Sequence, residues 1–267
     1  MGELRDEVAK QLEDLCAPGS ALHMDSPNAS WRAHVIGTDQ PYSDRYRADR
    51  LRMHGRLMNA FLARETDVQR NGYAAVVTAG PPAAGKTTRL DAQGYDETWR
   101  RIDPDVFKEM LILDDIASGR FTFPSEGLLA DGMPLMPLEL SGLYHRESVV
   151  IADRVREICM REHENIVIEG TLAWAGMADE LGRSLTEFGY ERLDVLLVEV
   201  PEEQAVEQAL QRWWAGRTQG TEMGGRFTPE AVIRAMYLDA TDTICREHAE
   251  ALFRAGQTSG MISSLIC

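Results

Sequence analysis

Residues 74–87 read AAVVTAGPPAAGKT, a short apolar run followed directly by a glycine-rich loop that ends in lysine and threonine. The loop from Gly80 to Thr87 has the spacing GxxxxGKT, and the residues that follow can begin a helix. In this strand-loop-helix context, the N–H groups of the backbone surround a β-phosphate and stabilise its negative charge. The stretch therefore predicts a site for a nucleoside triphosphate, ATP or GTP, on a parallel α/β sheet.

The side chains of this loop have separate expected roles. Lys86 is expected to bridge the β- and γ-phosphates, and the hydroxyl of Thr87 is expected to hold Mg²⁺. Pro81 and Pro82 have no N–H to donate, but they lie early in the loop and are expected to stiffen its entry. The expected nucleotide contacts are Gly80, Ala83, Ala84, Gly85, Lys86, Thr87 and Thr88.

Short apolar runs alternate with helical stretches from Tyr73 onward, which is typical of an α/β protein with a parallel sheet. Further strands are expected at residues 99–102, 166–168 and 195–200, and a helix that begins at Thr228-Pro229 is expected to end near Phe253. Residues after Gly256 give no clear pattern. We predict a three-layer α/β/α fold of the P-loop NTPase type, with a mainly parallel sheet, over residues 71–267.

The first 70 residues precede this pattern and are predicted to form a helical extension. Apolar side chains recur at helical spacing over residues 3–16. A second helix is expected over about residues 42–64, with its charged residues on a solvated face and five apolar residues facing inward: Leu51, Leu57, Met58, Phe61 and Leu62. Residues 23–40 are rich in Ser, Pro, Asn and Gly and are expected to form a loop.

Charge and composition exclude several classes of partner. The formal charge of −15 opposes binding to DNA or RNA, which depends on Lys and Arg replacing counterions, although a local basic pocket for a small phosphorylated molecule is compatible with it. No stretch approaches the roughly 18 apolar residues of a spanning helix, so a cytoplasmic protein without a membrane segment is expected. The four cysteines lack the paired spacing of a zinc site and are expected to be reduced.

Acidic motifs follow the second and third predicted strands. Residues 102–108 read IDPDVFK, and residues 166–171 read IVIEGT. Because ligands bind beyond the carboxyl ends of the strands in an open parallel sheet, these acidic residues are expected near the γ-phosphate. A carboxylate there can accept the proton of an attacking hydroxyl or help to hold Mg²⁺.

Taken in this order, the three motifs resemble the zeta toxin family of kinases, including its PezT-like members, over roughly residues 73–253. The resemblance implies transfer of a phosphoryl group from ATP or GTP to a sugar hydroxyl of UDP-N-acetylglucosamine, and an antitoxin protein as a partner. It implies that Asp105 is the catalytic base, with Asp103 as the alternative. An N-terminal extension that restrains activity, as a fused antitoxin would, is one hypothesis for residues 1–70, and a structural extension is the other.

The resemblance also implies which residues contact the acceptor. Glu169 and Thr171 match the Glu and Thr of the family's EGT motif, and Asp153 falls where the family has a substrate-binding Glu. For Asp153, a place on a solvated helical face is an equal alternative. Many relatives have an Arg soon after EGT, whereas here the sequence continues as Leu172-Ala173-Trp174. This difference leaves the nucleotide sugar open, and Trp174 either stacks on a base or sugar or belongs to the core.

Two arginines of a lid are implied as well. Arg212 and Arg226 match them, and guanidinium groups at these positions would stabilise charge on the transferring phosphoryl group. Arg217 lies between them and could replace either one or lie on a solvated face. The long apolar segment 119–142, broken by prolines, is expected to cover the site.

Other functions are compatible with the same motifs. A kinase for another small molecule, such as an antibiotic or a dinucleotide, would share the fold. A nucleotide-operated switch that binds a partner protein would share the phosphate loop but would hydrolyse the nucleotide slowly. The sequence leaves the acceptor, the choice between ATP and GTP, and the oligomeric state open.

Overall fold

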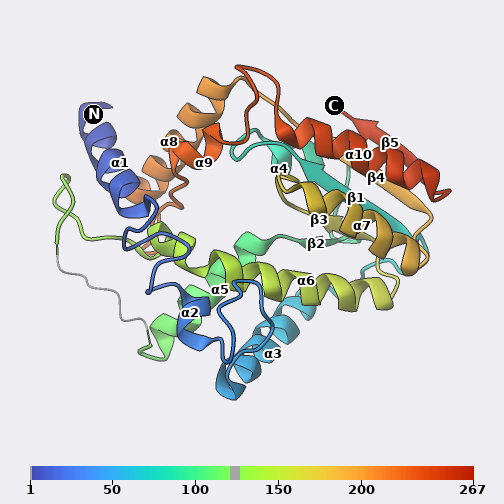
Figure 1. Cartoon of the computed structure of the whole chain (residues 1–267), viewed down its shortest axis with the longest axis horizontal. Helices are drawn as coiled ribbons and strands as arrows, with labels where there is room; N and C mark the ends of the chain where they lie inside the picture. Colours follow the sequence, from blue (N-terminus) through green and yellow to red (C-terminus); the bar gives the residue numbers. More distant parts are fainter. Residues whose placement is uncertain (1, 121–126) are drawn as a thin grey trace. The chain divides into compact units, whose positions relative to one another are not determined.

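The computed structural model describes residues 2–120 and 127–267 (Figure 1). The chain divides into two compact units, which are described separately. The sheet unit comprises residues 60–103, 152–208 and 231–267, and the helical unit comprises residues 1–59, 104–151 and 209–230. The predicted covering segment 119–142 lies partly outside the described residues.

The sheet unit is built on five parallel strands. Their order across the sheet is β2-β3-β1-β4-β5, so the strand that leads into the phosphate loop is central. The strands are β1 (Ala74–Ala79), β2 (Arg100–Ile102), β3 (Ile166–Ile168), β4 (Arg192–Leu197) and β5 (Ile262–Ile266). All four strand pairs are parallel, which confirms the predicted sheet type.

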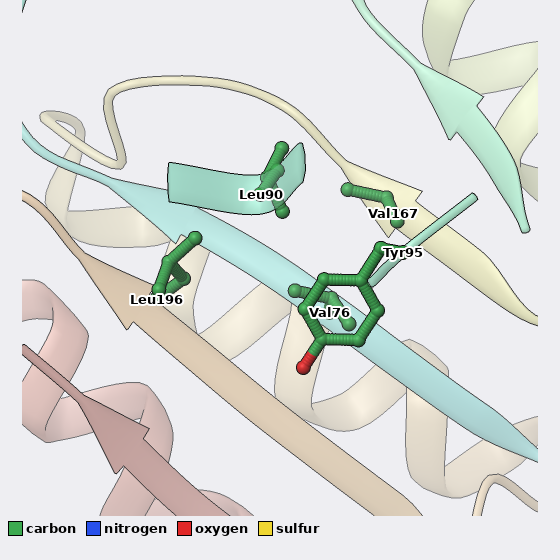
Figure 2. Close-up of a cluster of buried hydrophobic side chains, with 5 residues drawn as sticks. All are labelled: Val76, Leu90, Tyr95, Val167 and Leu196. Carbon is green, nitrogen blue, oxygen red and sulfur yellow. The ribbon is translucent and has the colours of Figure 1, made fainter. Parts of the chain in front are cut away.

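Helices cover both faces of this sheet. On one face, Leu90 of α4 (Lys86–Ala92) packs with Val76, Val167 and Leu196 of the three inner strands, and Tyr95 completes the cluster (Figure 2). On the other face, α10 (Ile244–Thr258) lies beside β4 and α7 (Ala175–Glu187). Alternate residues of a buried strand face opposite layers, so the apolar runs that predicted β1 and β3 contribute to both. The predicted three-layer α/β/α fold is confirmed.

The structure of the sheet unit differs from the prediction in three places. Strand β4 begins at Arg192 rather than at residue 195, and β5 was not predicted. The long helix expected from Thr228 to Phe253 is instead two helices, α9 (Glu230–Arg234) and α10. The chain turns between them, where Tyr237 and Thr243 form an antiparallel bridge, and the Thr243 hydroxyl accepts the N–H of Arg246 to cap α10.

The helical unit contains α1 (Gly2–Cys16), α2 (Ser30–His34), most of α3 (Ala48–Leu62), α5 (Pro104–Ala117) and the 3₁₀ helix η1 (Pro137–Tyr144). Two further helices, α6 (His145–Arg161) and α8 (Glu202–Gln219), contribute residues to both units. The helix expected over residues 3–16 is confirmed. The loop expected over residues 23–40 contains α2, because Trp31 is buried with Ala29, Tyr46 and Val150 and its indole N–H donates to the Met24 carbonyl.

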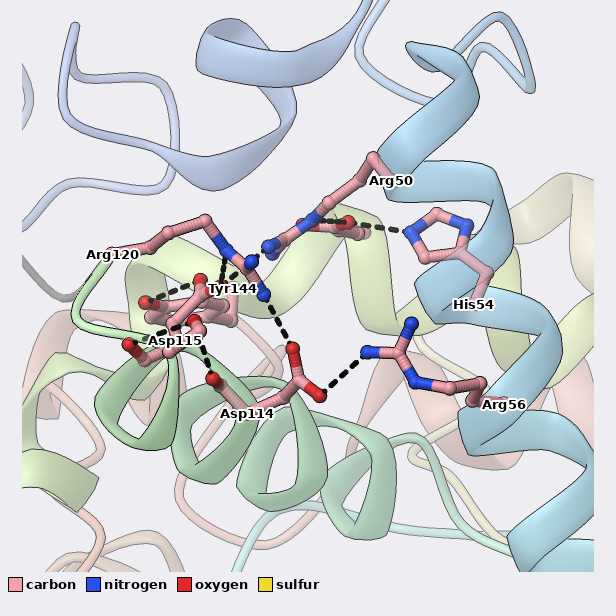
Figure 3. A network of polar contacts seen from close by, with 9 residues as sticks. Arg50, His54, Arg56, Asp114, Asp115, Arg120 and Tyr144 are labelled. Atoms are coloured by element: carbon pink, nitrogen blue, oxygen red, sulfur yellow. Dashed lines mark hydrogen bonds and ion pairs between the residues drawn. The ribbon is translucent and has the colours of Figure 1, made fainter.

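The face of α3 that the sequence placed in solvent is partly buried. Arg50 is buried and donates to both carboxylate oxygens of Glu147, at 2.7 and 2.9 Å, and to Asp115 at 2.6 Å (Figure 3). His54 Nε2 lies 2.6 Å from Glu147 Oε1. Leu57 and Phe61 are buried as expected, whereas Leu51, which was expected inside, is exposed. The buried side of α3 therefore combines these apolar side chains with the ionic contacts of Arg50 and His54.

The first 59 residues make contacts with later segments of the chain inside the helical unit. In the helical unit, the side chain of Gln11 accepts the N–H of Ala130, and the carboxylate of Glu13 accepts the N–H of Glu230. Arg146 forms a two-pronged ion pair with Asp25, at 2.6 and 2.7 Å. The first 59 residues thus share one packed unit with later segments of the chain.

No helix within the described ranges is both long enough and apolar enough to cross a membrane.

Candidate active site

The phosphate loop follows β1 at the centre of the sheet. Gly80 has φ +127°, and a Cβ at this position would lie 1.9 Å from the carbonyl oxygen of Val198, so glycine is required here. Ala83 and Gly85 also have positive φ, at +62° and +93°. The Lys86 ammonium donates to the carbonyls of Gly80 and Pro81, at 2.9 and 2.8 Å, and so curls over the loop. Thr87 and Thr88 lie exposed in the first turn of α4.

Glu169, at the end of β3, lies beside this loop. Thr87 Oγ1 donates to Glu169 Oε2 at 3.4 Å, and Arg101 Nε donates to Glu169 Oε1 at 3.0 Å. Arg101 also pairs with Asp91 of α4, at 2.7 Å. The sequence did not single out Arg101, although its position directly before the IDPD motif places it at the end of β2. It holds the Glu169 carboxylate at the phosphate loop.

The EGT turn is attached to the phosphate loop by backbone hydrogen bonds. The N–H of Gly80 donates to the Thr171 carbonyl at 3.0 Å. The Thr78 hydroxyl donates to the Gly170 carbonyl at 3.0 Å and accepts the Gly170 N–H at 2.9 Å. Because these bonds join the ends of β1 and β3, the phosphate loop and the EGT turn form one structure.

The oxygen atoms of Thr87 and Glu169 suit a magnesium ion. Mg²⁺ prefers oxygen ligands, keeps several waters, and binds proteins through one or two side chains together with substrate phosphates. Within the described part of the chain, no group of three or more His, Cys, Asp or Glu side chains has metal-binding geometry. The hydroxyl of Thr87 and the carboxylate of Glu169 are oxygen donors of the type that binds Mg²⁺ together with a nucleotide.

Asp105 lies in the first turn of α5, in the helical unit. Lys108 Nζ lies 2.7 Å from Asp105 Oδ1, and Arg226 Nη1 lies 2.8 Å from Asp105 Oδ2. Burial raises the pKa of this carboxyl group, but the positive charges of Lys108 and Arg226 outweigh it and lower the pKa to about 2. Asp105 is therefore ionised at neutral pH. Asp103 precedes α5 by one residue and is half-buried.

Two further titratable residues, Lys108 and His145, interact with Asp105. Lys108 belongs to the IDPDVFK motif and reaches back by one helical turn to the carboxylate. Burial, together with the charge of Lys108, lowers the pKa of His145 to about 3. His145 is consequently neutral at physiological pH, and the positive charge around Asp105 comes from Lys108 and Arg226.

The two arginines that the family resemblance assigns to a lid have different surroundings. Arg212 is exposed on α8, and Arg226 is held by Asp105. Arg217 is buried, pairs with Glu139 at 2.7 Å and with Asp131 at 2.6 Å, and so cannot replace either arginine without breaking these pairs. The alternative of a solvated face for Arg217 is wrong. Trp213 is buried beside it and donates to Glu139 at 2.9 Å.

Asp153 and Trp174 belong to the sheet unit. The Asp153 carboxylate pairs with Arg156 at 2.9 Å on the same helix, α6, and its side chain is 44% exposed. A side chain that is half-exposed and held on its own helix is compatible with both alternatives for Asp153, a substrate contact and a solvated face. Trp174 is 64% exposed, so the alternative of a core residue is wrong.

The predicted site residues thus form two groups. In the sheet unit, the structure brings together Lys86, Thr87, Glu169 and Thr171, which offer an ammonium, two hydroxyls and a carboxylate at a loop of backbone donors. In the helical unit, it brings together Asp105 and Arg226 and adds Lys108 to them. The first group has the chemistry of a triphosphate site, and the second presents an ionised carboxylate with two cations.

Comparisons with known proteins find a family match, sequence relatives and similar solved structures. The family model described as Zeta toxin matches residues 129–258, a range that includes Glu169, Thr171 and both lid arginines and begins after the phosphate loop. Adenylate kinases from two strains of Thermus thermophilus are 28% identical over 140 residues, which is 52% of this chain and 65% of each relative. The chain thus spans slightly under two thirds of the length of these relatives.

Among solved structures, the chain is similar to AvrRxo1-ORF1:AvrRxo1-ORF2. The structure of that pair with ATP has a TM-score of 0.62 at 15% identity, covering 89% of this chain and 72% of the other, and the structure with sulphate ions has a TM-score of 0.61. At this identity the likeness supports the fold. The family match and the kinase relatives agree with the predicted class of enzyme, a phosphotransferase. The predicted resemblance to the zeta toxin family is confirmed over residues 129–258.

Proposed function

We propose that this protein is a kinase that transfers the γ-phosphate of ATP or GTP to a hydroxyl group of a small molecule. The observation that carries the proposal is the contact between the Thr87 hydroxyl and the Glu169 carboxylate at a phosphate loop of GxxxxGKT spacing. A loop that only binds phosphate needs backbone donors and a lysine. A carboxylate bonded to the loop hydroxyl adds the oxygen ligands for a metal ion, which phosphoryl transfer requires.

The donor half of the reaction belongs to the sheet unit. Lys86 exchanges the carbonyls of Gly80 and Pro81 for the β- and γ-phosphates of the nucleotide, because a phosphate oxygen is a stronger acceptor for an ammonium group than a neutral carbonyl. Thr87 and Glu169 would hold Mg²⁺, which when bound neutralises charge on the β- and γ-phosphates. Arg101 keeps the Glu169 carboxylate oriented towards the loop.

The acceptor half uses Asp105 as the catalytic base, with Asp103 as the alternative. A pKa of about 2 makes Asp105 a weak base, but the transition state of phosphoryl transfer is loose and needs little proton removal before the new bond forms. Asp105 mainly orients the attacking hydroxyl by accepting its hydrogen bond. Arg226 leaves the carboxylate and stabilises the transferring phosphoryl group together with Arg212.

We propose a nucleotide sugar as the acceptor, with UDP-N-acetylglucosamine as the first candidate. Glu169, Thr171 and Asp153 are the proposed contacts to it, on the family resemblance. An antitoxin protein as a partner, which the family resemblance implies, and a cytoplasmic location, which the sequence composition predicts, belong to the same proposal.

The test is a transfer assay with ATP labelled at the γ-phosphate and UDP-N-acetylglucosamine as the acceptor. We expect labelled sugar nucleotide from the native protein and loss of most turnover in Asp105→Asn, which keeps the shape of the side chain but not its charge. Thermal stabilisation by ATP should persist in this variant. Label that appears only as free phosphate, across a panel of sugar nucleotides, would refute the kinase assignment.

A second candidate acceptor is another nucleotide or a dinucleotide. The similarity to adenylate kinases favours this candidate, because the name of these enzymes identifies a nucleotide, adenylate, as the acceptor. The same assay with AMP and with a dinucleotide, in place of the sugar nucleotide, separates the two candidates by which product carries the label.

A further inference from the structure

Trp174 is exposed to an extent that is unusual for its size. Its relative accessibility is 64%, whereas Trp31 and Trp213 are 2% and 0% exposed. Burial of an aromatic side chain stabilises the folded protein, so an indole ring that stays in solvent does not contribute this stabilisation. A single exposed apolar residue is common, and exposure alone assigns no role. The contacts of Trp174 and of its loop provide the evidence for a role.

The indole ring of Trp174 packs against a backbone position, Gly176, where any side chain would collide with the ring. A Cβ built on Gly176 would lie 2.4 Å from Cζ2 of Trp174 and 2.7 Å from Cη2, so the ring lies directly against the backbone of Gly176. Any other residue at position 176 would displace it. The ring is therefore supported from below by the first turn of α7 while most of its surface remains open.

The loop that carries Trp174 is held in one conformation. Leu172 has φ +54°, which is rare for a branched residue, and its side chain is buried. Its carbonyl lies 2.8 Å from His248 Nδ1, which donates to it, and the N–H of Ala173 donates to Thr171 Oγ1 at 3.3 Å. Strained backbone of this kind persists only where the surrounding contacts fix it, and such residues concentrate at ligand sites.

The position of this loop relates it to a nucleotide. Trp174 follows Thr171 by three residues, and the Thr171 carbonyl accepts the N–H of Gly80 in the phosphate loop. The same turn carries Glu169, which contacts Thr87. A molecule whose phosphates lie at this loop therefore has a large, flat apolar surface on the adjoining, rigid turn.

We propose that Trp174 is a stacking surface for a nucleobase, a purine or pyrimidine ring. This inference rests on the proposed function, since it assumes a nucleotide at the phosphate loop or at the EGT turn. The ring belongs either to the donor or to a nucleotide-containing acceptor, and both present the same planar π-face. An aromatic platform accepts any base, because stacking does not depend on the hydrogen-bonding edge.

The experiment compares ligands with and without a base. Titration calorimetry measures the dissociation constants of UMP, of AMP and of ribose 5-phosphate, and of the ATP analogue in which nitrogen bridges the β- and γ-phosphates, with Mg²⁺. We expect Trp174→Ala to weaken at least one base-containing ligand by roughly 10- to 100-fold and to leave ribose 5-phosphate unchanged. Trp174→Phe should retain most of the affinity, because a phenyl ring still stacks. Weakening of UMP or AMP alone assigns the base to the acceptor, and weakening of the ATP analogue alone assigns it to the donor.

The control is Leu238→Ala, which removes another exposed apolar side chain of the sheet unit and should leave all four constants unchanged. Unchanged affinities in Trp174→Ala overturn the stacking proposal, as does a Trp174→Phe variant that is folded by circular dichroism and as weak as Trp174→Ala. The proposed function fails separately: there, the native protein and Lys86→Ala would bind the ATP analogue equally well.

Discussion

Burial and the neighbouring positive charges shift the pKa of the Asp105 carboxyl group in opposite directions. Burial disfavours its charged form, while Lys108 and Arg226, at 2.7 and 2.8 Å, favour it and prevail. Each cation occupies a different oxygen, so the carboxylate is fixed in orientation as well as in charge. Lys108 is the cation that belongs to the same helix and would stay when Arg226 turns to a phosphoryl group. It is a positioning residue for the proposed base.

A change of Lys108 to methionine should alter the pH dependence of the reaction. The native pKa of Asp105 is about 2, so we expect kcat/KM for phosphoryl transfer to show no acid limb due to this group above about pH 4. Without Lys108, burial raises the pKa and one opposing charge is gone, so an acid limb should appear at higher pH. The measurement is kcat/KM from pH 4 to 8 for both proteins.

The matched control is Lys10→Met. Lys10 is an exposed residue of α1, and its removal changes the net charge by the same amount. It should reproduce the native profile. Coincident profiles of Lys108→Met and the native protein would show that Lys108 does not set the charge state of the base.

For individual residues, the sequence was enough to predict those roles that depend on local spacing. The positions of Lys86 and Thr87 in a loop after an apolar strand are enough to predict a phosphate site. The pairing of Arg217 was not predictable, because its partners Asp131 and Glu139 are 86 and 78 residues away in the chain. The buried pair of Arg50 and Glu147 was missed for the same reason, with a separation of 97 residues. A charged residue looks solvated until the residue that neutralises it is known.

The phosphate loop is the element whose geometry can be tested most directly. In Gly80→Ala the new methyl group would lie 1.9 Å from the Val198 carbonyl oxygen, at a φ of +127° that alanine rarely adopts. The loop must shift, and its N–H groups and Lys86 lose their alignment. We expect the affinity for ADP with Mg²⁺ to fall by at least about tenfold, measured by calorimetry, since about 1.4 kcal/mol is enough for that change.

Gly94→Ala is the control for backbone strain. Gly94 also has positive φ, at +81°, but a Cβ there meets no atom within 4 Å. This variant should lose a little stability and keep native affinity for ADP. Equal affinities of the two variants would mean that the close approach of Gly80 to Val198 does not shape the nucleotide site.

A strand or helix could be predicted from the sequence when its burial appears as a local run or period of apolar residues. Every residue of β1 and β3 is buried; β3 is an uninterrupted apolar run, and β1 is interrupted only by Thr78. Strand β5 lies at the edge of the sheet, with two serines and an exposed Ile262, so it lacks that signal. The helix expected from Thr228 was broken by a turn that the tertiary fold imposes, where Tyr237 donates to the Val200 carbonyl at 2.8 Å.

For the molecule as a whole, the buried network of Arg50, Glu147 and Asp115 should make stability depend on pH. The pKa of Glu147 is lowered to about 2: burial raises it, and the contacts with His54 and Arg50 outweigh this effect. A carboxyl group with a folded pKa below its unfolded value of about 4.3 stabilises the fold above that pH and loses its contribution as the pH falls towards 2.

Arg50→Met removes the common partner and leaves two buried carboxylates without it. We expect a loss of roughly 3–5 kcal/mol in the free energy of unfolding at pH 7, measured with urea, and a smaller difference from the native protein at pH 3. Arg56→Met is the control, since Arg56 is 62% exposed where it pairs with Asp114, and its loss should cost only about 0–1 kcal/mol. A difference that does not shrink at low pH would assign the effect of Arg50 to packing rather than to charge.

Removal of residues 1–40 tests whether the N-terminal segment restrains the enzyme or belongs to its fold. Within the helical unit, Val8 and Leu12 of α1 are fully buried, Trp31 of α2 packs with Val150, and Asp25 pairs with Arg146. Deletion would expose these partners to water, so we expect a lower melting temperature and reduced transfer activity. The measurements are differential scanning calorimetry and the labelled-phosphate assay, with Asp25→Asn as a milder variant that breaks only the ion pair. A truncated protein that melts at the native temperature and is more active would instead establish the segment as a restraint. Removal of a core element would lower the melting temperature, so an unchanged melting temperature excludes a core role for the segment.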